Sequence, residues 1–249
     1  MNCSYVEFNQ FNQFNQFPIS SKKMQEAPIY YNDSLTTNNM DLSDWDAKLA
    51  NGWDRVGLYF FRRQYDYVEG FNQKLEYIRL RFQLMPLRFR LDDDFSFTKS
   101  QRINQKRNKD LRCVYGQASL SEEKLLLFNA WHITRFGHLS NIEQWFAAED
   151  CPFPTMECCV YDQERLVACS FFDSTPNSNY STLAFYDPYE KKRGLGTFTL
   201  LLEIEFGLKN KKLYHYPGHA HYGNTMYDYK KKFNNAERFD WNILDWVKL

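Results

Sequence analysis

The pattern over residues 155–216 restricts the fold of this chain more than any other feature. Two segments of strand-like composition are separated by a polar turn at 162–165 and predict a β-hairpin, and more strand and helix patterns follow. This order predicts an α+β fold. The elements we expect are strands at 155–161, 166–173, 182–186 and 213–216 and a helix at about 197–208.

The loop before that helix carries the clearest binding pattern. Its two glycines permit a tight turn, so that free N–H groups at the helix N-terminus can face an anion, and three basic residues precede them. The loop predicts a phosphate site, with an ordinary glycine turn as the alternative. The order of strands, glycine loop and helix is that of an acetyltransferase-type core, in which such a loop holds the pyrophosphate of coenzyme A. The loop residues concerned are Lys191, Lys192, Arg193, Gly194, Gly196 and Thr197.

Upstream, residues 41–52 predict a capped helix, 55–62 a strand, 75–91 further β structure and 119–136 a second helix. Residues 99–112 form a basic segment whose cations would line one side of a helix or an extended arm. Such a line of charge would track phosphates, and a solvated charged face is the alternative.

Several long motifs resemble those of the bacterial arginyl/leucyl-tRNA–protein transferases. Residues 166–205 resemble "G-x-L-[IV]-A-V…V-D…S-x-x-Y-x-F-Y-D-P…L-G-x-x-x-L-x-x-I-E", and 229–233 resemble the Y-K-x-x-F tail. Residues 49–62 are similar to "L-L-x-x-G-W-R-R-x-G-x-x-F-[FY]-R", and 86–111 to "[VP]-x-R…x-S-Q-R-R-x-x-R-R-N-x-D-L". Arg135 stands at the family's R-H-x-x-G. The resemblance covers roughly residues 40–249.

This resemblance implies a GNAT-like (acetyltransferase-like) domain, with a mixed sheet flanked by helices, plus a smaller N-terminal α/β region. It implies an enzyme that moves arginine, or leucine or lysine, from charged tRNA to an N-terminal α-amine. The chemistry is aminolysis of an ester, which needs alignment, an amine base and donors for the oxyanion.

The resemblance also suggests site residues. We expect Tyr186 and Asp187 to be catalytic, Asp187 recognising the donor's cationic group, although Asp187 could instead cap the turn before Pro188. The acceptor pocket would be lined by His215, His221 and Tyr229, with His215 or His221 as a candidate amine base. Residues expected to bind aminoacyl-tRNA are Lys99, Ser100, Gln101, Arg102, Lys106, Arg107, Arg135, Lys191, Lys192, Arg193, Gly194, Gly196, Thr197 and Lys230.

One family motif is missing. The family carries C-x-x-C after its F-[FY]-R strand, where this chain has residues 62–70 without cysteine. We therefore expect no metal cluster there, and the acceptor usual for the family is in doubt. The alternatives are an acyl-CoA-dependent N-acyltransferase and a non-catalytic tRNA-binding adaptor.

The cysteines and histidines do not predict a cofactor. Cys158 and Cys159 are adjacent on a predicted strand and would point to opposite faces, so we expect neither disulfides nor zinc. His215, His219 and His221 have spacings that metals use, but no carboxylate or cysteine nearby completes the set, and a pocket wall is the favoured interpretation.

Composition sets the remaining expectations. The formal charge of zero argues against indiscriminate nucleic-acid binding, and neither a signal peptide nor a membrane span is evident, so we expect a cytoplasmic protein that does not enter membranes. The partners would be aminoacyl-tRNA and an acceptor N-terminus, with the oligomeric state open. We expect a partly disordered arm at 1–39, a transferase region at 40–115 and the GNAT-like domain at 116–249.

Overall fold

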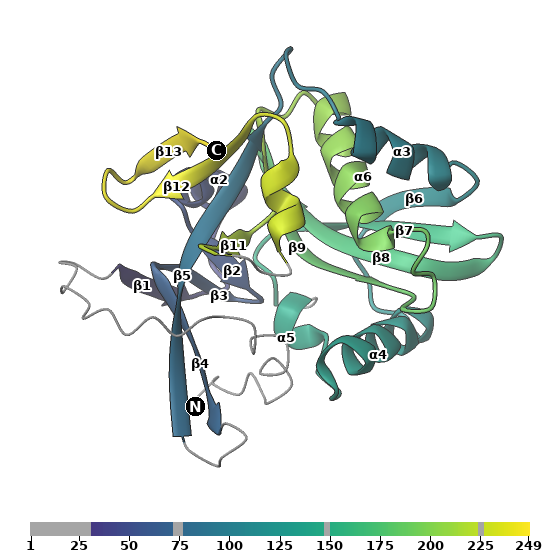
Figure 1. Ribbon diagram of the computed structural model, residues 1–249, viewed down its shortest axis with the longest axis horizontal. Helices are drawn as coiled ribbons and strands as arrows, with labels where there is room; N and C mark the ends of the chain where they lie inside the picture. Colours follow the sequence, from purple (N-terminus) through teal and green to yellow (C-terminus); the bar gives the residue numbers. More distant parts are fainter. Residues whose placement is uncertain (1–30, 72–76, 147–149, 224–226) are drawn as a thin grey trace.

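The protein is described by a computed structural model over residues 31–71, 77–146, 150–223 and 227–249. Within these ranges one large mixed sheet of ten strands runs through the molecule, with helices on both sides (Figure 1). Along its main path the strands, in spatial order, are β13 (Asp245–Lys248), β12 (Ala236–Asp240), β5 (Tyr77–Arg90), β10 (Tyr214–Tyr216), β9 (Ser178–Tyr186), β8 (Arg165–Ser174), β7 (Thr155–Asp162) and β6 (Arg112–Gln117). The α+β class is confirmed, as is the predicted order of hairpin, third strand, glycine loop, helix and fourth strand.

Two helical layers cover the right-hand part of this sheet in Figure 1. On one face α6 (Leu195–Lys209) and α3 (Lys99–Arg107) pack together, and Leu195, Phe198 and Leu202 of α6 join Cys158 in one apolar cluster. On the other face α4 (Glu122–Phe136) and α5 (Glu143–Phe146) cover a second cluster that contains Cys159. The two neighbouring cysteines therefore lie on opposite faces, as strand alternation predicts.

A smaller sheet forms beside the large one. Its strands are β1 (Asn32–Thr36), β3 (Tyr59–Arg63) and β2 (Asp54–Val56), in that spatial order, and α2 (Leu42–Ala50) packs near them. The predicted helix at 41–52 is confirmed: Asp41 caps it, and Trp45 and Leu49 are fully buried. The strand predicted at 55–62 is instead a hairpin, because Gly57, with φ 57°, turns the chain between β2 and β3.

The central strands β9 and β10 run parallel for only three residue pairs, from Tyr214 beside Ser178 to Tyr216 beside Tyr180. The chain then turns at Gly218, whose φ is 78°, and β11 (His219–His221) pairs with β5 instead. Beyond Tyr180, β9 continues along β8 only. Residues that follow this separation, here called the splay, include η2 (Asp228–Lys232), a short 3-10 helix that contacts β11.

The expected domain boundary at 115/116 does not separate two sheets, because it falls inside β6, and β5 from the upstream region joins the same large sheet as β6–β10. The expected arm at 1–39 falls largely outside the described residues, and its last part forms β1, which pairs with β3. Among the helices the structure describes, none is both long and apolar enough to cross a membrane. The three-part division thus remains a prediction.

Candidate functional site

The glycine loop before α6 is held from outside by α3. Asn104 donates its side-chain amide to the carbonyl oxygens of Arg193 (3.2 Å) and Gly194 (3.1 Å), and the Asn108 amide donates to Arg193 O (3.0 Å). Gly194 has φ 64°, and a Cβ there would lie 2.8 Å from Asn104 Nδ2. Glycine is thus required at 194 both by backbone conformation and by the closeness of α3.

The second glycine of the loop makes room for an aromatic ring. A Cβ on Gly196 would lie 2.7 Å from Cε1 of Tyr186, so the ring rests against the first turn of α6. Thr197, in the same turn, is half-buried. This contact fixes Tyr186, at the end of β9, directly beside the predicted anion loop.

The charged side chains at the loop mostly bind one another. Arg193 forms a two-bond ion pair with Asp110 (3.1 and 2.9 Å). Asp187 pairs with Arg165 and accepts a hydrogen bond from Tyr189 N (2.9 Å), which is the turn-capping alternative for this residue. These contacts explain the two side chains as parts of the loop's own framework, so their predicted donor-binding and catalytic roles remain untested.

The predicted basic segment is a helix with an exposed basic side. Thr98 and Gln101 form a capping box, so buried Gln101 belongs to the start of α3, and Ser100 Oγ lies 3.1 Å from Thr98 Oγ1. Arg107 donates to Lys192 O (2.9 Å), which places the cations of α3 next to those of the loop. We call the exposed cations of both elements the basic surface. It comprises Lys99, Arg102, Lys106, Arg107, Lys191 and Lys192.

Four predicted residues from three elements meet at the splay. Arg135, at the end of α4, reaches Tyr186 OH with Nη1 at 3.5 Å. Its charge also acts on Tyr229 and Lys230 of η2. Tyr229 keeps 36% of its surface exposed. The sequence suggested each of these residues separately, and the fold brings them together although they lie up to 95 positions apart (230 − 135).

Lys230 is the cation at the centre of this group. Its ammonium donates to the carbonyl oxygens of Pro217 (2.6 Å) and His219 (3.4 Å). Burial lowers the pKa of Lys230 to about 8, although the carboxylates of Asp54 and Glu203 act in the opposite direction. The ammonium is therefore held in place by backbone oxygens and interacts electrostatically with two acids.

Glu203, one of the two acids that act on Lys230, is a buried residue that the sequence did not predict as part of a site. Burial raises the pKa of Glu203, on α6, to about 8, against a hydrogen bond that it accepts from Ser181. His215 Nε2 lies 3.1 Å from Ser181 Oγ, and burial together with the charge of Lys230 lowers the pKa of His215 to about 3. His215 has no exposed surface, which counts against its predicted roles as pocket wall and amine base.

A second histidine of the same segment is differently placed. His219 Nδ1 lies 2.7 Å from Oδ2 of Asp54, a buried carboxylate at the start of β2. The sequence suggested His219, with His215 and His221, only as part of a pocket wall, and it suggested no role for Asp54. The 165 positions between them carry no spacing signal. His221, the remaining predicted pocket residue, is half-buried on β11, and burial followed by the charge of His219 lowers its pKa to about 4.

Asp54 is positioned by the residue that follows it. Arg55 is buried and binds Asp173 of β8 through two hydrogen bonds of 2.7 and 2.6 Å. Trp45 of α2 donates to the same carboxylate (3.0 Å). This buried pair ties the small sheet to the large one next to the splay.

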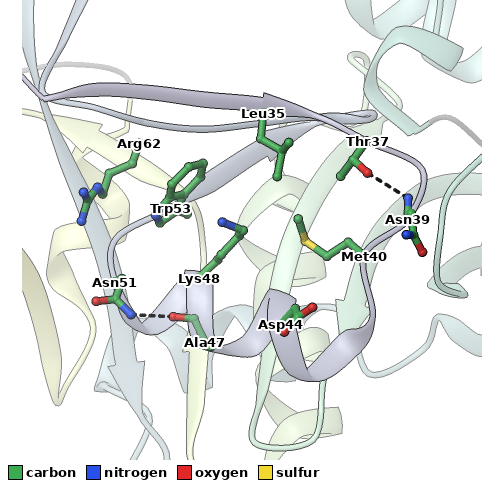
Figure 2. A pocket seen from close by; sticks show the side chains of 10 residues that line it. All are labelled: Leu35, Thr37, Asn39, Met40, Asp44, Ala47, Lys48, Asn51, Trp53 and Arg62. Atoms are coloured by element: carbon green, nitrogen blue, oxygen red, sulfur yellow. Dashed lines mark hydrogen bonds between the residues drawn. The ribbon is translucent and has the colours of Figure 1, made fainter.

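Two other features lie away from this group. Glu157, Cys159 and Cys169 place their ligand atoms within 4.8 Å of one another, but Lys124 Nζ already lies 2.6 Å from the Glu157 carboxylate and supplies the positive charge. A pocket of about 600 Å³ lies between α2 and the small sheet (Figure 2), where Lys48 Nζ sits 3.9 Å from the centre of the Trp53 ring. No predicted site residue lines it.

The chain is similar to known proteins mainly through its C-terminal half. Residues 123–240 match the model of the family described as arginine-tRNA-protein transferase, C terminus. The aspartate/glutamate leucyltransferase of Pseudomonas aeruginosa (strain LESB58) is 31% identical over 120 residues, which are 45% of this chain and 49% of that protein. A protein of the same name from Helicobacter hepaticus is 23% identical over 211 residues, 80% of each chain.

Among solved structures, L-PGS from Bacillus licheniformis has a TM-score of 0.47 at 13% identity, and the match covers 69% of this chain and 59% of that chain. The match to the Pseudomonas relative spans about half the length of that protein. The family match and both leucyltransferase relatives agree with the motifs. The C-terminal half of the chain is thus similar to the arginyl/leucyl-tRNA–protein transferase family.

Proposed function

We propose that this protein transfers an amino acid from charged tRNA to the N-terminal α-amine of a protein or peptide. The observation that carries the proposal is the meeting of Arg135, Tyr186, Tyr229 and Lys230 beside the glycine loop. The names of the relatives make leucine the first donor to test, with arginine second. For the same reason, peptides that begin with Asp or Glu are the first acceptors to test.

The reaction needs little more than alignment, because the aminoacyl ester is already activated. Tyr186 is fixed against α6 and offers its hydroxyl to the ester. Arg135 and Lys230 provide positive charge for the 3′ end of the tRNA and for the oxyanion that forms during attack. Tyr229, next to Lys230 in η2 and partly exposed, would border the incoming amine.

The body of the tRNA would bind the basic surface. Its cations are exposed on α3 and on the loop, and the two elements are joined through the hydrogen bond from Arg107 to Lys192 O. Cations arranged in this way neutralise successive phosphates and give an affinity that falls with salt.

The test is single-turnover transfer from tRNA charged with labelled leucine or arginine to peptides that differ in their N-terminal residue. We expect labelled peptide with the wild-type protein, and a rate at least about 100-fold lower for Arg135→Gln, because a cation that stabilises the developing charge is lost. Arg90→Gln, at an exposed end of β5, is the matched control and should stay within about twofold.

Other outcomes would favour the alternatives. Turnover of acetyl-CoA without any labelled peptide would support an acyl-CoA-dependent N-acyltransferase. Salt-dependent binding of tRNA without transfer of any amino acid would support the non-catalytic adaptor.

A further inference from the structure

We propose that His219, oriented by Asp54, is the base that takes the proton from the acceptor amine. The inference rests on the proposed function and gives a chemical role to a histidine that the sequence suggested only as part of a pocket wall. It begins from the short contact of 2.7 Å between His219 Nδ1 and Asp54 Oδ2.

Asp54 can only accept hydrogen bonds in this arrangement. Its Oδ1 accepts from the hydroxyl of Tyr180 and from the backbone N–H of Arg55 (2.9 Å). Burial alone would raise the pKa of Asp54, but the hydrogen bond and charge of His219, with the bond from Tyr180, lower it. The carboxylate is therefore ionised and rigidly held.

An ionised, fully engaged carboxylate fixes the histidine tautomer. Nδ1 of His219 must carry the proton that Asp54 accepts, so in the neutral ring Nε2 keeps its lone pair. The side chain of His219 keeps 26% of its surface exposed, in contrast to fully buried His215. A substrate can thus reach the side chain of His219, whereas it cannot reach His215.

The pair belongs to the same site as the predicted residues. Lys230 donates to the backbone oxygen of His219 and also interacts electrostatically with Asp54 and Arg135. Arg135 in turn reaches Tyr186. Geometry agrees: a Cβ on Gly218 would lie 3.8 Å from Lys230 Nζ and 3.9 Å from Asp54 Oδ2, so the ammonium and the carboxylate flank the same backbone position next to His219.

The step balances without any co-reactant. The neutral acceptor amine attacks the ester carbonyl, a C–N bond forms, and the amine nitrogen becomes positively charged. Nε2 of His219 takes a proton from that nitrogen. When the tetrahedral intermediate collapses, the C–O bond to the tRNA ribose breaks, and the proton passes from Nε2 to the departing 3′ oxygen.

The charged and titratable groups around His219 come from each element packed against it. Asp54 faces it from β2, Lys230 and Tyr227 from η2 and the residue before it, and His221 from its own strand, with ring centroids 5.8 Å apart. From β5 the facing residue is Pro86, which does not titrate.

The test compares single-turnover transfer by wild type, His219→Asn and Asp54→Asn over about pH 5–8, the range in which histidine titrates. We expect the wild-type rate to rise with pH through this range. The His219→Asn rate should fall by about 10²–10⁴-fold and lose that rising limb, because general-base catalysis is removed. The rate of Asp54→Asn should also fall, because an asparagine amide that donates to Nδ1 of His219 stabilises the tautomer with its proton on Nε2.

His138→Asn, at the end of α4, is the matched control and should stay within about twofold with the wild-type pH profile. Since Asp54 also bonds Tyr180, thermal melting of each variant is measured alongside, and imidazole added to His219→Ala should restore part of the rate. A His219→Asn rate within about threefold of wild type, with the limb retained, would overturn the proposal and leave the transferase function standing. Wild type that transfers nothing would overturn both.

Discussion

At the scale of single residues, Glu203 gives the clearest pH signature. Its pKa in the folded protein is raised to about 8 by burial, above the ordinary value of 4.5. Between these two values the folded state keeps a proton that the unfolded chain has released, so the contribution of Glu203 to stability falls as pH rises from 4.5 to 8. A residue of the same shape that cannot ionise should not show this loss.

We therefore expect Glu203→Gln to raise the melting temperature at pH 8 by about 2–4 °C, equivalent to roughly 1 kcal/mol, with a much smaller gain at pH 5. Thermal melting at the two pH values measures this. Glu164→Gln, in the exposed turn after β7, is the control, and its effect on the melting temperature should be the same at pH 5 and pH 8. An equal gain of Glu203→Gln at pH 5 and pH 8 would mean that Glu203 does not ionise near neutrality.

At the scale of elements, the glycine loop is shaped by α3. Gly194→Ala forces an L-residue into φ 64° and directs a methyl group at Asn104. We expect a loss of about 1–2 kcal/mol in the free energy of unfolding, measured by urea denaturation. Gly116→Ala is the control: a Cβ there meets nothing within 4 Å, so the change should stay within about 0.5 kcal/mol. Equal losses in the free energy of unfolding for the two variants would show that α3 does not restrict the residue at position 194.

The sequence predicts an element where the local signal is strong, and it does not where pairing with a distant strand determines the conformation. Helix α2 and the hairpin β7–β8 follow from periodicity and caps. Strand β1 does not, because every residue of Asn32–Thr36 is exposed and the segment is extended by its pairing with β3. The hairpin turn at Gly57 does have a signal in the sequence, the glycine itself, which lies inside the strand expected at 55–62.

At the scale of the whole molecule, the site is assembled from contacts that no local pattern encodes. Arg135, Tyr186 and Lys230 were predicted singly from motifs, whereas the pair of Asp54 and His219 depends on how the small sheet sits against the splay. That placement is fixed by buried Arg55, which binds Asp173 of the large sheet. Burial and partner choice are properties of the complete fold, so sequence spacing could not supply them.

Loss of one partner from the buried ion pair of Arg55 and Asp173 should lower stability strongly. Asp173→Ala leaves the Arg55 guanidinium buried without its carboxylate, so we expect a loss of about 3–5 kcal/mol in the free energy of unfolding. Asp33→Ala breaks the exposed pair with Arg62 and should cost at most about 1 kcal/mol. Replacing both partners, Arg55→Met with Asp173→Leu, should cost less than Asp173→Ala alone, because no unpaired charge remains. Urea denaturation of these variants measures the three values, and an Asp173→Ala loss below about 1 kcal/mol would show that another contact joins the two sheets.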